Sequence, residues 1–452
     1  MTKKALLITG QESETVSTLA RNLIHVGGLS IFARQMKQMK AIGVDEMHVV
    51  TDWFTTDFEK EILNCTERPE RIFIHTTKEA PLRLLEHNNE GNIWFLIEEA
   101  VVIDDRIIAQ IAKHPSPSVI SFIGHNEFLS SRTAGGMLLQ LEDQDGYFGA
   151  IAKLSSGTLA ANVRKLNTLE GLPGALKAIS RASDCMIAKI THIPLYIPGH
   201  RRDVDLVWFP VIRREDGNRA TDALLEFTEK ETLDWPAKYI HRPIENLMVR
   251  YICKCPVVPY QITVVTGILG FYIMYLFSSG HMLPALFGAY IVGIMAGVGG
   301  KLACVSMQTP TIYKLEHLLD RLVEYGWYFA IAAFLSTPHG EAPYIMATAL
   351  ILFRLADEIQ SNFFRRLTGF HIYDTAPFDR KLRLVGGGRN TQMWALLPFA
   401  LYGQWYAGFG FICLYGIVTF FIHQLRLVYH LKNMVIANNE IFTENFKKNQ
   451  KL

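Results

Sequence analysis

Long apolar stretches separated by polar loops dominate the second half of the chain. A helix that crosses a bilayer needs about 20 mostly apolar residues, and several segments after Arg250 have this character. Their approximate bounds are Val257–Phe277, Met282–Gly299, Tyr325–Leu335 with its preceding turns, Ala342–Leu355, Met393–Leu401 with its continuation, and Phe409–Leu425. We therefore expect residues 257–435 to form an all-α bundle of six transmembrane helices.

The charges of the connecting loops predict the orientation of this bundle, because Lys and Arg collect in cytoplasmic loops. Almost no positive charge occurs in Ser278–His281, Ser336–Pro343 and Tyr402–Ala407. The loops that alternate with them are basic and contain Lys301, Lys314, Arg321, Arg354, Arg365, Arg366, Arg380, Lys381, Arg383, Arg389, Arg426 and Lys432. A soluble helical core has no reason to segregate loop charge in this way. We expect an integral membrane protein whose N-terminal domain and both termini are cytoplasmic.

The overall composition limits the classes of partner. The chain has 452 residues and a formal net charge of +2, so its bulk charge gives no reason to expect a nucleic-acid partner. Its six cysteines lack the paired spacing of a zinc site. The membrane lipid bilayer is the partner that the composition does predict.

The first 225 residues alternate strand-like and helix-like patterns. Short apolar runs predict buried strands at Ala5–Thr9, Glu46–Thr51, Arg71–His75, Ile93–Ile97 and Val119–Ile123. Amphipathic patterns predict helices at Leu29–Ile42 and Asp105–Lys113. This order predicts a doubly wound α/β domain over residues 1–225. An amphipathic membrane-surface helix and linker should follow over residues 226–256, and a cytoplasmic tail over residues 436–452.

Short motifs in the membrane half resemble those of the CDP-alcohol phosphotransferases and occur in the same order, over roughly residues 230–435. His241-Arg242-Pro243-Ile244 resembles the Asn-Arg-Pro-Ile of a helix at the membrane surface. Pro259-Tyr260-Gln261-Ile262-Thr263 resembles the Pro-Asn-Gln-Ile-Thr that opens the first span. The run from Leu315 to Glu324 resembles Leu-Asp-x-x-Leu-Asp-Arg-x-x-Asp, and Gly388-Arg389-Asn390 also looks familial.

This resemblance implies a transferase of phospholipid or polar-lipid headgroup synthesis. It would move a phospho-alcohol from a CDP-alcohol to a hydroxyl acceptor and release CMP, with Mg²⁺ or Mn²⁺ neutralising the pyrophosphate. The resemblance makes Glu316, Asp320 and Glu324 metal ligands, with Glu316 and Asp320 catalytic, and it places Gly300 and Lys301 near phosphate. Residues four apart lie on one helix face, and carboxylates inside a membrane are functional by default. The family also implies a CDP-alcohol or related nucleotide as ligand, and a homodimer.

The chain departs from the family signature D-x-x-D-G-x-x-A-R. Aligned on it, Ala296 and Gly299 stand where the first two aspartates belong, and Cys304 stands where the arginine belongs. Half of the metal-binding carboxylates are therefore replaced. The alternative role for Glu316, Asp320 and Glu324 is a polar seam that pairs with Arg321 or Lys314.

The N-terminal half resembles the sugar-nucleotide nucleotidyltransferases. Arg21–Leu29 resembles their Lys-Pro-Leu-x-x-Val-Gly-Gly, with Arg21 in place of the nucleotide-binding lysine, and Gly43–Thr51 matches their Gly-Val-Asp-Glu-Ile-x-Val-Val-Thr. Trp94–Asp104 resembles their central strand, and Arg214-Glu215-Asp216 their late Thr-Pro-Glu-Asp turn. The whole chain resembles bifunctional enzymes that make CDP-inositol and then inositol phosphodiesters.

This half departs from its family too. Gly10–Thr15 contains one glycine and two acids where a glycine-rich loop should bind the triphosphate. Ala100 stands at the metal-binding aspartate, with Glu98 and Glu99 as displaced substitutes, and Trp208–Val211 replaces a late Trp-x-Asp-x-Asp.

Two functions remain open from the sequence. The first is the phosphotransferase reaction, supported by the retained carboxylates of Glu316, Asp320 and Glu324. The alternative is a catalytically degenerate membrane protein of the same fold that binds a nucleotide or lipid, or serves as a scaffold for a partner. Replacements at matching positions in both halves favour the alternative.

Overall fold

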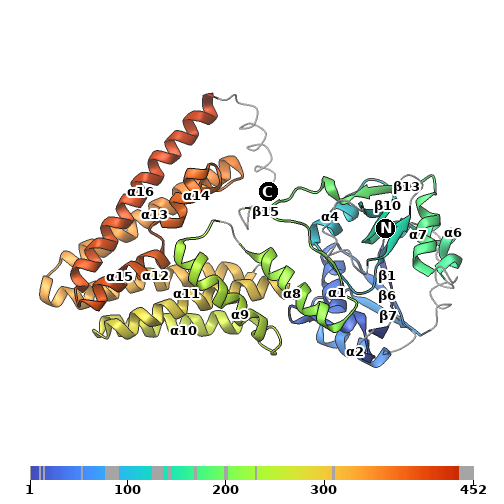
Figure 1. The fold of residues 1–452 in the computed structure, drawn as a ribbon, viewed down its shortest axis with the longest axis horizontal. Coiled ribbons are helices and arrows are strands. Elements are labelled where there is room, and N and C mark those ends of the chain that lie inside the picture. Colours follow the sequence, from blue (N-terminus) through green and yellow to red (C-terminus); the bar gives the residue numbers. More distant parts are fainter. Residues whose placement is uncertain are drawn as a thin grey trace. The chain divides into compact units, whose positions relative to one another are not determined.

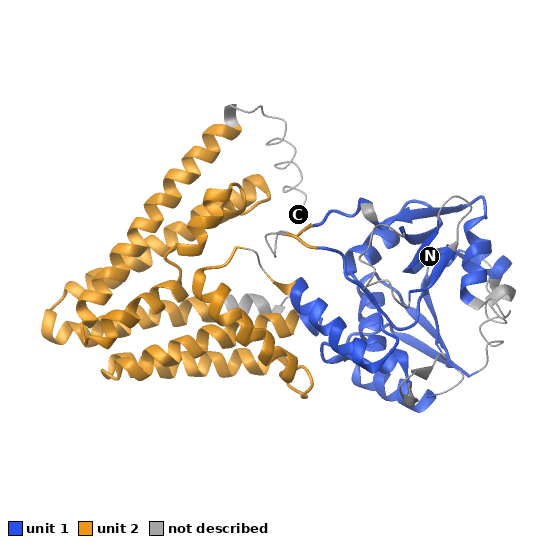
Figure 2. Cartoon of the chain, viewed as in Figure 1, with its two compact units in different colours: residues 1–195, 205–227, 305–307 blue, residues 196–204, 228–304, 308–452 orange. Residues whose placement is uncertain are grey.

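The chain forms two compact units, which are described separately (Figures 1 and 2). A computed structural model describes residues 2–9, 12–13, 16–51, 54–76, 91–124, 136–140, 145–166, 171–197, 202–229, 232–307 and 311–436. Unit 1 contains residues 1–195, 205–227 and 305–307, and unit 2 contains residues 196–204, 228–304 and 308–452.

A mixed β-sheet forms the centre of unit 1. Its strands run in the order β13-β10-β12-β8-β1-β6-β7, and β11 pairs with β12. Their bounds are β1 Lys3–Ile8, β6 Glu46–Val50, β7 Arg71–His75, β8 Ile93–Ile97, β10 Ser118–Gly124, β11 Leu138–Gln140, β12 Asp145–Ser155 and β13 Cys185–Lys189. β12 runs antiparallel to both β8 and β10, whereas β1 pairs with β6 and β8 in parallel.

Helices cover both faces of this sheet. On the face of Ala5 and Leu7, the apolar side chains of α1 (Ile31–Ala41), α2 (Thr55–Asn64) and α4 (Asp105–Lys113) form one core. On the face of Leu6, α6 (Ser156–Leu166) and α7 (Gly171–Ser180) form a second core. The α/β class predicted for this half is therefore confirmed, and every strand and helix predicted in it exists within two residues of its expected bounds.

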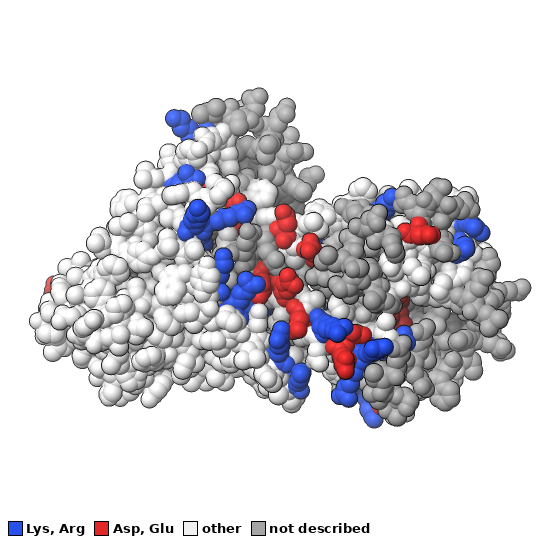
Figure 3. Space-filling view, viewed as in Figure 1, with Lys and Arg blue, Asp and Glu red and all other residues white. Residues whose placement is uncertain are grey.

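Unit 2 consists of helices. Their bounds are η3 Ala237–His241, α9 Arg242–Ile252, α10 Pro259–Ser278, α11 Met282–Val305, α12 Thr311–His339, α13 Ala342–Thr368, α14 Pro377–Val385, α15 Arg389–Leu401 and α16 Trp405–Ile436. Each apolar segment predicted from the sequence lies in α10, α11, α12, α13, α15 or α16, except that Val257 and Val258 precede α10. Of the helices in the described ranges, three are long and apolar enough to cross a membrane, at Pro259–Ser278, Met282–Val305 and Trp405–Met434. Much of the face of unit 2 drawn in Figure 3 shows no charged side chain among its described residues.

The short helix α9 presents apolar side chains outward. Ile244, Leu247 and Tyr251 are exposed, whereas the carboxylate-bearing Glu245 is buried. An outward apolar stripe is what a helix at a lipid interface needs.

Several basic residues predicted in loops lie within helices instead, which corrects the sequence analysis. Lys301, Arg321 and Arg354 belong to α11, α12 and α13, and Arg389 begins α15. The reason is that these helices extend beyond the apolar stretches by which they were recognised. α13, for example, continues to Thr368 rather than ending near Leu355.

Candidate functional site

A small cavity lies among α10, α11 and α12. Its volume is about 20 Å³, which is room for about one water molecule. It is lined by Thr263, Thr266, Gly267, Val292, Met295, Ala296, Gly299, Leu319, Asp320 and Val323. The structure therefore brings Ala296 and Gly299, the positions aligned with the first two aspartates, together with the retained Asp320.

Asp320 is the acidic side chain that lines this cavity, and its charge is balanced by an arginine. Arg389 Nη1 at the start of α15 donates to Asp320 Oδ1 at 3.0 Å. The Thr263 and Thr266 hydroxyls donate to the carbonyl oxygens one turn earlier in α10, those of Pro259 and Ile262. A guanidinium thus stands beside the carboxylate for which a divalent cation was expected.

Glu324, one turn further along α12, has a similar environment. Arg354 Nε of α13 lies 3.2 Å from Glu324 Oε1, and the Tyr328 hydroxyl donates to the same oxygen at 3.1 Å. Tyr328 also contacts Gln392 of α15. Glu324 is 7% exposed, and carboxylates buried to this degree are normally paired and hydrogen-bonded.

Lys301 and Gly300 do not line the cavity, although the sequence placed them near phosphate. Lys301 Nζ lies 3.1 Å from Glu245 Oε2 and donates to Asn246 Oδ1 at 2.6 Å, both on α9. The Glu245 carboxylate lies directly against Gly297, where an added Cβ would come within 2.1 Å of Oε1. Lys301 therefore links α11 to α9 through its contacts with Glu245 and Asn246.

The described residues do not fit a two-metal cluster. Ala296 and Gly299 have no side-chain donor atoms, and Arg389 engages one oxygen of Asp320. Within the described ranges, no three His, Cys, Asp or Glu side chains are grouped so as to hold a metal ion. Glu316 lies on α12 four residues before Asp320, but its side chain and that of Lys314 are outside the described residues. Arg321, the other cation considered for the carboxylates, pairs with Glu358.

Arg354 was not predicted as part of this site, and Arg389 was noted only within the family-like Gly388-Arg389-Asn390. Both were interpreted as loop cations that set membrane orientation. The available signal was their position, because each lies close in sequence to an apolar stretch that forms a helix. Charged side chains at such positions usually face a partner inside the bundle.

In unit 1, Ala100, the position aligned with the metal-binding aspartate, lies beside the Trp208–Val211 segment that replaces the late Trp-x-Asp-x-Asp. β9 (Val101–Ile103) pairs antiparallel with β16 (Trp208–Pro210), and just beyond this ladder the Val211 N–H donates to the Ala100 carbonyl at 2.8 Å. Ala100 and Val211 are buried and apolar. Ala100 has φ of 55°, which is uncommon for a residue with a Cβ.

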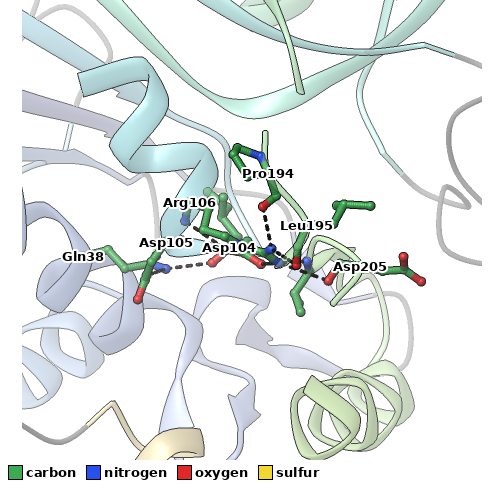
Figure 4. Close-up of polar contacts among 9 residues, drawn as sticks. Gln38, Asp104, Asp105, Arg106, Pro194, Leu195 and Asp205 are labelled. Atoms are coloured by element: carbon green, nitrogen blue, oxygen red, sulfur yellow. Dashed lines mark hydrogen bonds and ion pairs between the residues drawn. The ribbon is translucent and has the colours of Figure 1, made fainter. Parts of the chain in front are cut away.

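Asp104 and Arg106 hold this ladder in register (Figure 4). Asp104 Oδ2 accepts from the Val207 N–H at 3.1 Å and also pairs with Arg106 Nη2 at 2.9 Å. Arg106 donates to the carbonyl oxygens of Pro194 and Leu195, both at 3.2 Å, and of Asp205 at 3.3 Å. Asp104 therefore binds the backbone of the neighbouring segment and the side chain of Arg106.

Glu98 is poorly suited to replace the missing metal-binding aspartate. Glu98 is 5% exposed and its Oε1 accepts from the Met137 N–H at 3.2 Å. Burial raises the pKa of Glu98 to about 8, so this carboxyl is largely neutral at pH 7 and a poor metal ligand. Arg21 lies in the short η1 helix (Arg21–Leu23), and β2 (Glu12–Ser13) and β3 (Val16–Ala20) form a hairpin where the glycine-rich loop was expected. Gly10, Gln11, Glu14 and Thr15 are outside the described residues.

The sequence matches no protein-family model and no curated protein. Solved structures similar to the N-terminal half include a CTP transferase and a cytidylyltransferase. The inositol-1-phosphate CTP transferase from T. maritima is 11% identical with a TM-score of 0.36, covering 48% of this chain and 91% of that chain. HddC from Yersinia pseudotuberculosis is 11% identical with a TM-score of 0.35, covering 49% and 99%. The CTP:phosphocholine cytidylyltransferase LicC from Streptococcus pneumoniae is 8% identical with a TM-score of 0.35, covering 50% and 100%.

Proposed function

We propose that this protein is a catalytically degenerate membrane protein of the CDP-alcohol phosphotransferase architecture, with six spans, that binds a nucleotide or a phospholipid headgroup without transferring it. The observation that carries the proposal is the pairing of Asp320 with Arg389 beside Ala296 and Gly299. In this arrangement the protein supplies the positive charge that metal ions would otherwise supply.

The chemistry of arginine suits this role. A guanidinium presents several N–H donors in a plane and binds phosphate oxygens bidentately. Arg389 can therefore exchange its bond to Asp320 for one to a phosphate group. Arg354, held by Glu324 on the next turn, adds a second positive charge. Binding of this kind does not require a divalent cation.

Binding of CDP to the detergent-purified full-length protein tests the proposal, measured once with Mg²⁺ and once with EDTA. We expect binding that is unaffected by EDTA and that weakens about tenfold or more in Arg389→Gln, the loss typical of a charge-assisted hydrogen bond. Arg321→Gln is the matched control, because Arg321 is more exposed and pairs with Glu358. Absence of CDP binding at millimolar concentration would contradict the proposal for nucleotides. The same assay with phosphatidylglycerol vesicles then tests whether the protein binds a phospholipid headgroup.

The transfer reaction itself is the second candidate. It is favoured by Asp320, which lines the cavity on α12 four residues after Glu316. In that case Mg²⁺ or Mn²⁺ would be held by Glu316 and Asp320. CDP binding that requires Mg²⁺ and disappears in the double variant Glu316→Gln, Asp320→Asn would support this candidate, and release of CMP from a CDP-alcohol would establish it.

A further inference from the structure

The short helix α14 is held against α16 by one buried carboxylate (Figure 1). Asp379 is 1% exposed, and Arg426 of α16 donates to both of its oxygens, at 2.5 Å from Nε and 2.9 Å from Nη2. His430 Nε2 lies 2.7 Å from Asp379 Oδ2. At the other end of α14, the Tyr415 hydroxyl donates to the Val385 carbonyl. Contacts at both ends therefore fix which face of α14 turns toward α16.

A different face of α14 carries an exposed apolar stripe that contains a lysine. Phe378, Lys381 and Val385 are three and four residues apart, so they lie along one side of the helix. All three are exposed, Phe378 by 56% and Val385 by 53%. The Arg426 guanidinium lies 5.1 Å from the centroid of the Phe378 ring. The buried cluster thus directs these three side chains, the α14 stripe, away from the helix bundle.

The contact with α16 also indicates the depth at which α14 lies. The part of α16 that is long and apolar enough to cross a membrane begins at Trp405. From Trp405 to Arg426 a helix rises about 30 Å, which is about the thickness of the hydrocarbon core of a bilayer. Arg426, and with it α14, therefore lies where the hydrocarbon ends and the lipid headgroups begin.

The charges on this side of unit 2 are of one sign. In residues 365–385, all of which the structure describes, every exposed charged residue is basic: Arg365, Arg366, Arg380 and Lys381. The acidic residue of α14 is the buried Asp379. Lysine is depleted in the cores of protein interfaces, whereas a lysine beside apolar side chains is typical of helices that lie on anionic membranes. The composition of the stripe therefore favours a lipid surface over a second protein.

We propose that α14 is a membrane-surface helix that binds the anionic phospholipid headgroups of the surrounding bilayer. Phe378 and Val385 enter the boundary between headgroups and acyl chains, and Lys381 pairs with lipid phosphate. Asp379 is a positioning residue, because its bonds to Arg426 and His430 set the rotation of the helix. This surface goes beyond the proposed function, since it includes none of the residues that line the cavity and serves attachment to the bilayer.

The test uses a fluorescent probe on α14 of the full-length protein in lipid nanodiscs. The cysteines that are not buried, Cys185, Cys255 and Cys304, are replaced by alanine, and the environment-sensitive dye NBD is attached at Val385→Cys. The nanodiscs contain phosphatidylcholine alone or phosphatidylcholine mixed with phosphatidylglycerol. We expect phosphatidylglycerol to move the emission to shorter wavelength and to protect the dye from aqueous iodide. High salt should reduce this effect, because it screens exposed charges.

Two charge variants in this labelled protein complete the experiment. Lys381→Gln should raise the content of phosphatidylglycerol needed for half of the effect about fivefold, the usual contribution of one basic residue at an anionic surface. Lys60→Gln is the matched control, because it removes the same charge from an exposed position on α2. It should respond as the unsubstituted protein does. CDP binding by Lys381→Gln should also be unchanged, so this proposal and the proposed function can fail separately.

Three results would overturn the proposal. The first is a dye that iodide reaches equally in both kinds of nanodisc. The second is an equal response of Lys381→Gln and Lys60→Gln. The third is a dye that is protected to the same extent with and without phosphatidylglycerol, which would mean that neutral lipid or a second copy of the chain covers the α14 stripe.

Discussion

At the residue scale, buried titratable side chains make the stability of unit 1 depend on pH. Glu98 is buried at the end of β8, and burial raises its pKa from 4.5 to about 8. His48 of β6 and His75 of β7 stack on each other with Nδ1 and Nε2 2.9 Å apart. Burial lowers the pKa of both histidines below 6.5. The pH windows of these groups overlap and their effects on stability have opposite signs, so each contribution is measured with its own variant.

The Glu98→Gln variant should remove a loss of stability that develops as pH rises from about 4.5 to 8. In wild type the folded state keeps a proton at Glu98 that the unfolded chain has lost in this window, so the contribution of Glu98 to stability falls as pH rises through it. The slope approaches about 1.4 kcal/mol per pH unit. The stability of β8 measured by hydrogen exchange should fall less with rising pH in the variant than in wild type. Glu59→Gln, an exposed control on α2, should keep the wild-type slope.

The His75→Leu variant should remove a loss of stability at acidic pH. Because the folded pKa values of His48 and His75 are lowered, the unfolded chain binds protons first, and the contribution of these histidines to stability falls as pH drops below about 6.5. Exchange protection of β7 between pH 7 and 5 should decline less in the variant. His25→Gln serves as the control, since His25 is exposed. Equal declines in wild type and His75→Leu would show that other groups dominate.

At the element scale, α10 and α12 pack closely because of a glycine. Trp327 Nε1 on α12 donates to the Gly270 carbonyl at 2.9 Å. A Cβ added at Gly270 would lie 2.8 Å from both methyl carbons of Val323. Small residues permit such close approach between membrane helices, and this contact lies beside the cavity wall formed by Val323.

Gly270→Ala should therefore destabilise unit 2 by about 1–3 kcal/mol, the usual result of overpacking. Val323 is β-branched and cannot rotate away without losing its own packing. Gly267→Ala, one turn earlier on the same helix, is the matched control, because its added Cβ would lie 3.9 Å from Leu319. Thermal unfolding in detergent compares the two, and equal melting temperatures would show that α12 can move.

At the scale of the whole molecule, the number of spans determines where the C-terminus lies. Three helices satisfy both the length and the hydropathy of a span, whereas α12, α13 and α15 carry buried polar groups such as Glu324, Asp357 and Gln392. A helix inside a bundle can span with such groups if neighbours satisfy them. Six spans place both termini on one side of the membrane, and three place them on opposite sides.

Cysteine labelling in oriented vesicles should distinguish these topologies. After Cys255 and Cys304, which are exposed, are replaced by alanine, we expect Ser279→Cys and Gln404→Cys to react from one side and Lys381→Cys from the other. With three spans, Gln404→Cys would instead react from the same side as Lys381→Cys. The side from which Gln404→Cys is labelled therefore distinguishes six membrane spans from three.

Local patterns in the sequence determined the elements, whereas the tertiary structure decided the pairing of charges. β7, β8 and α4 were predicted with their observed bounds, because side-chain periodicity depends on neighbours along the chain. The antiparallel β12 was not predicted, since strand direction depends on distant partners. Aligned motifs indicated that Ala296 and Gly299 replace aspartates. Only folding showed that Asp320 meets Arg389, because 69 residues separate them and buried charges pair in space rather than along the chain.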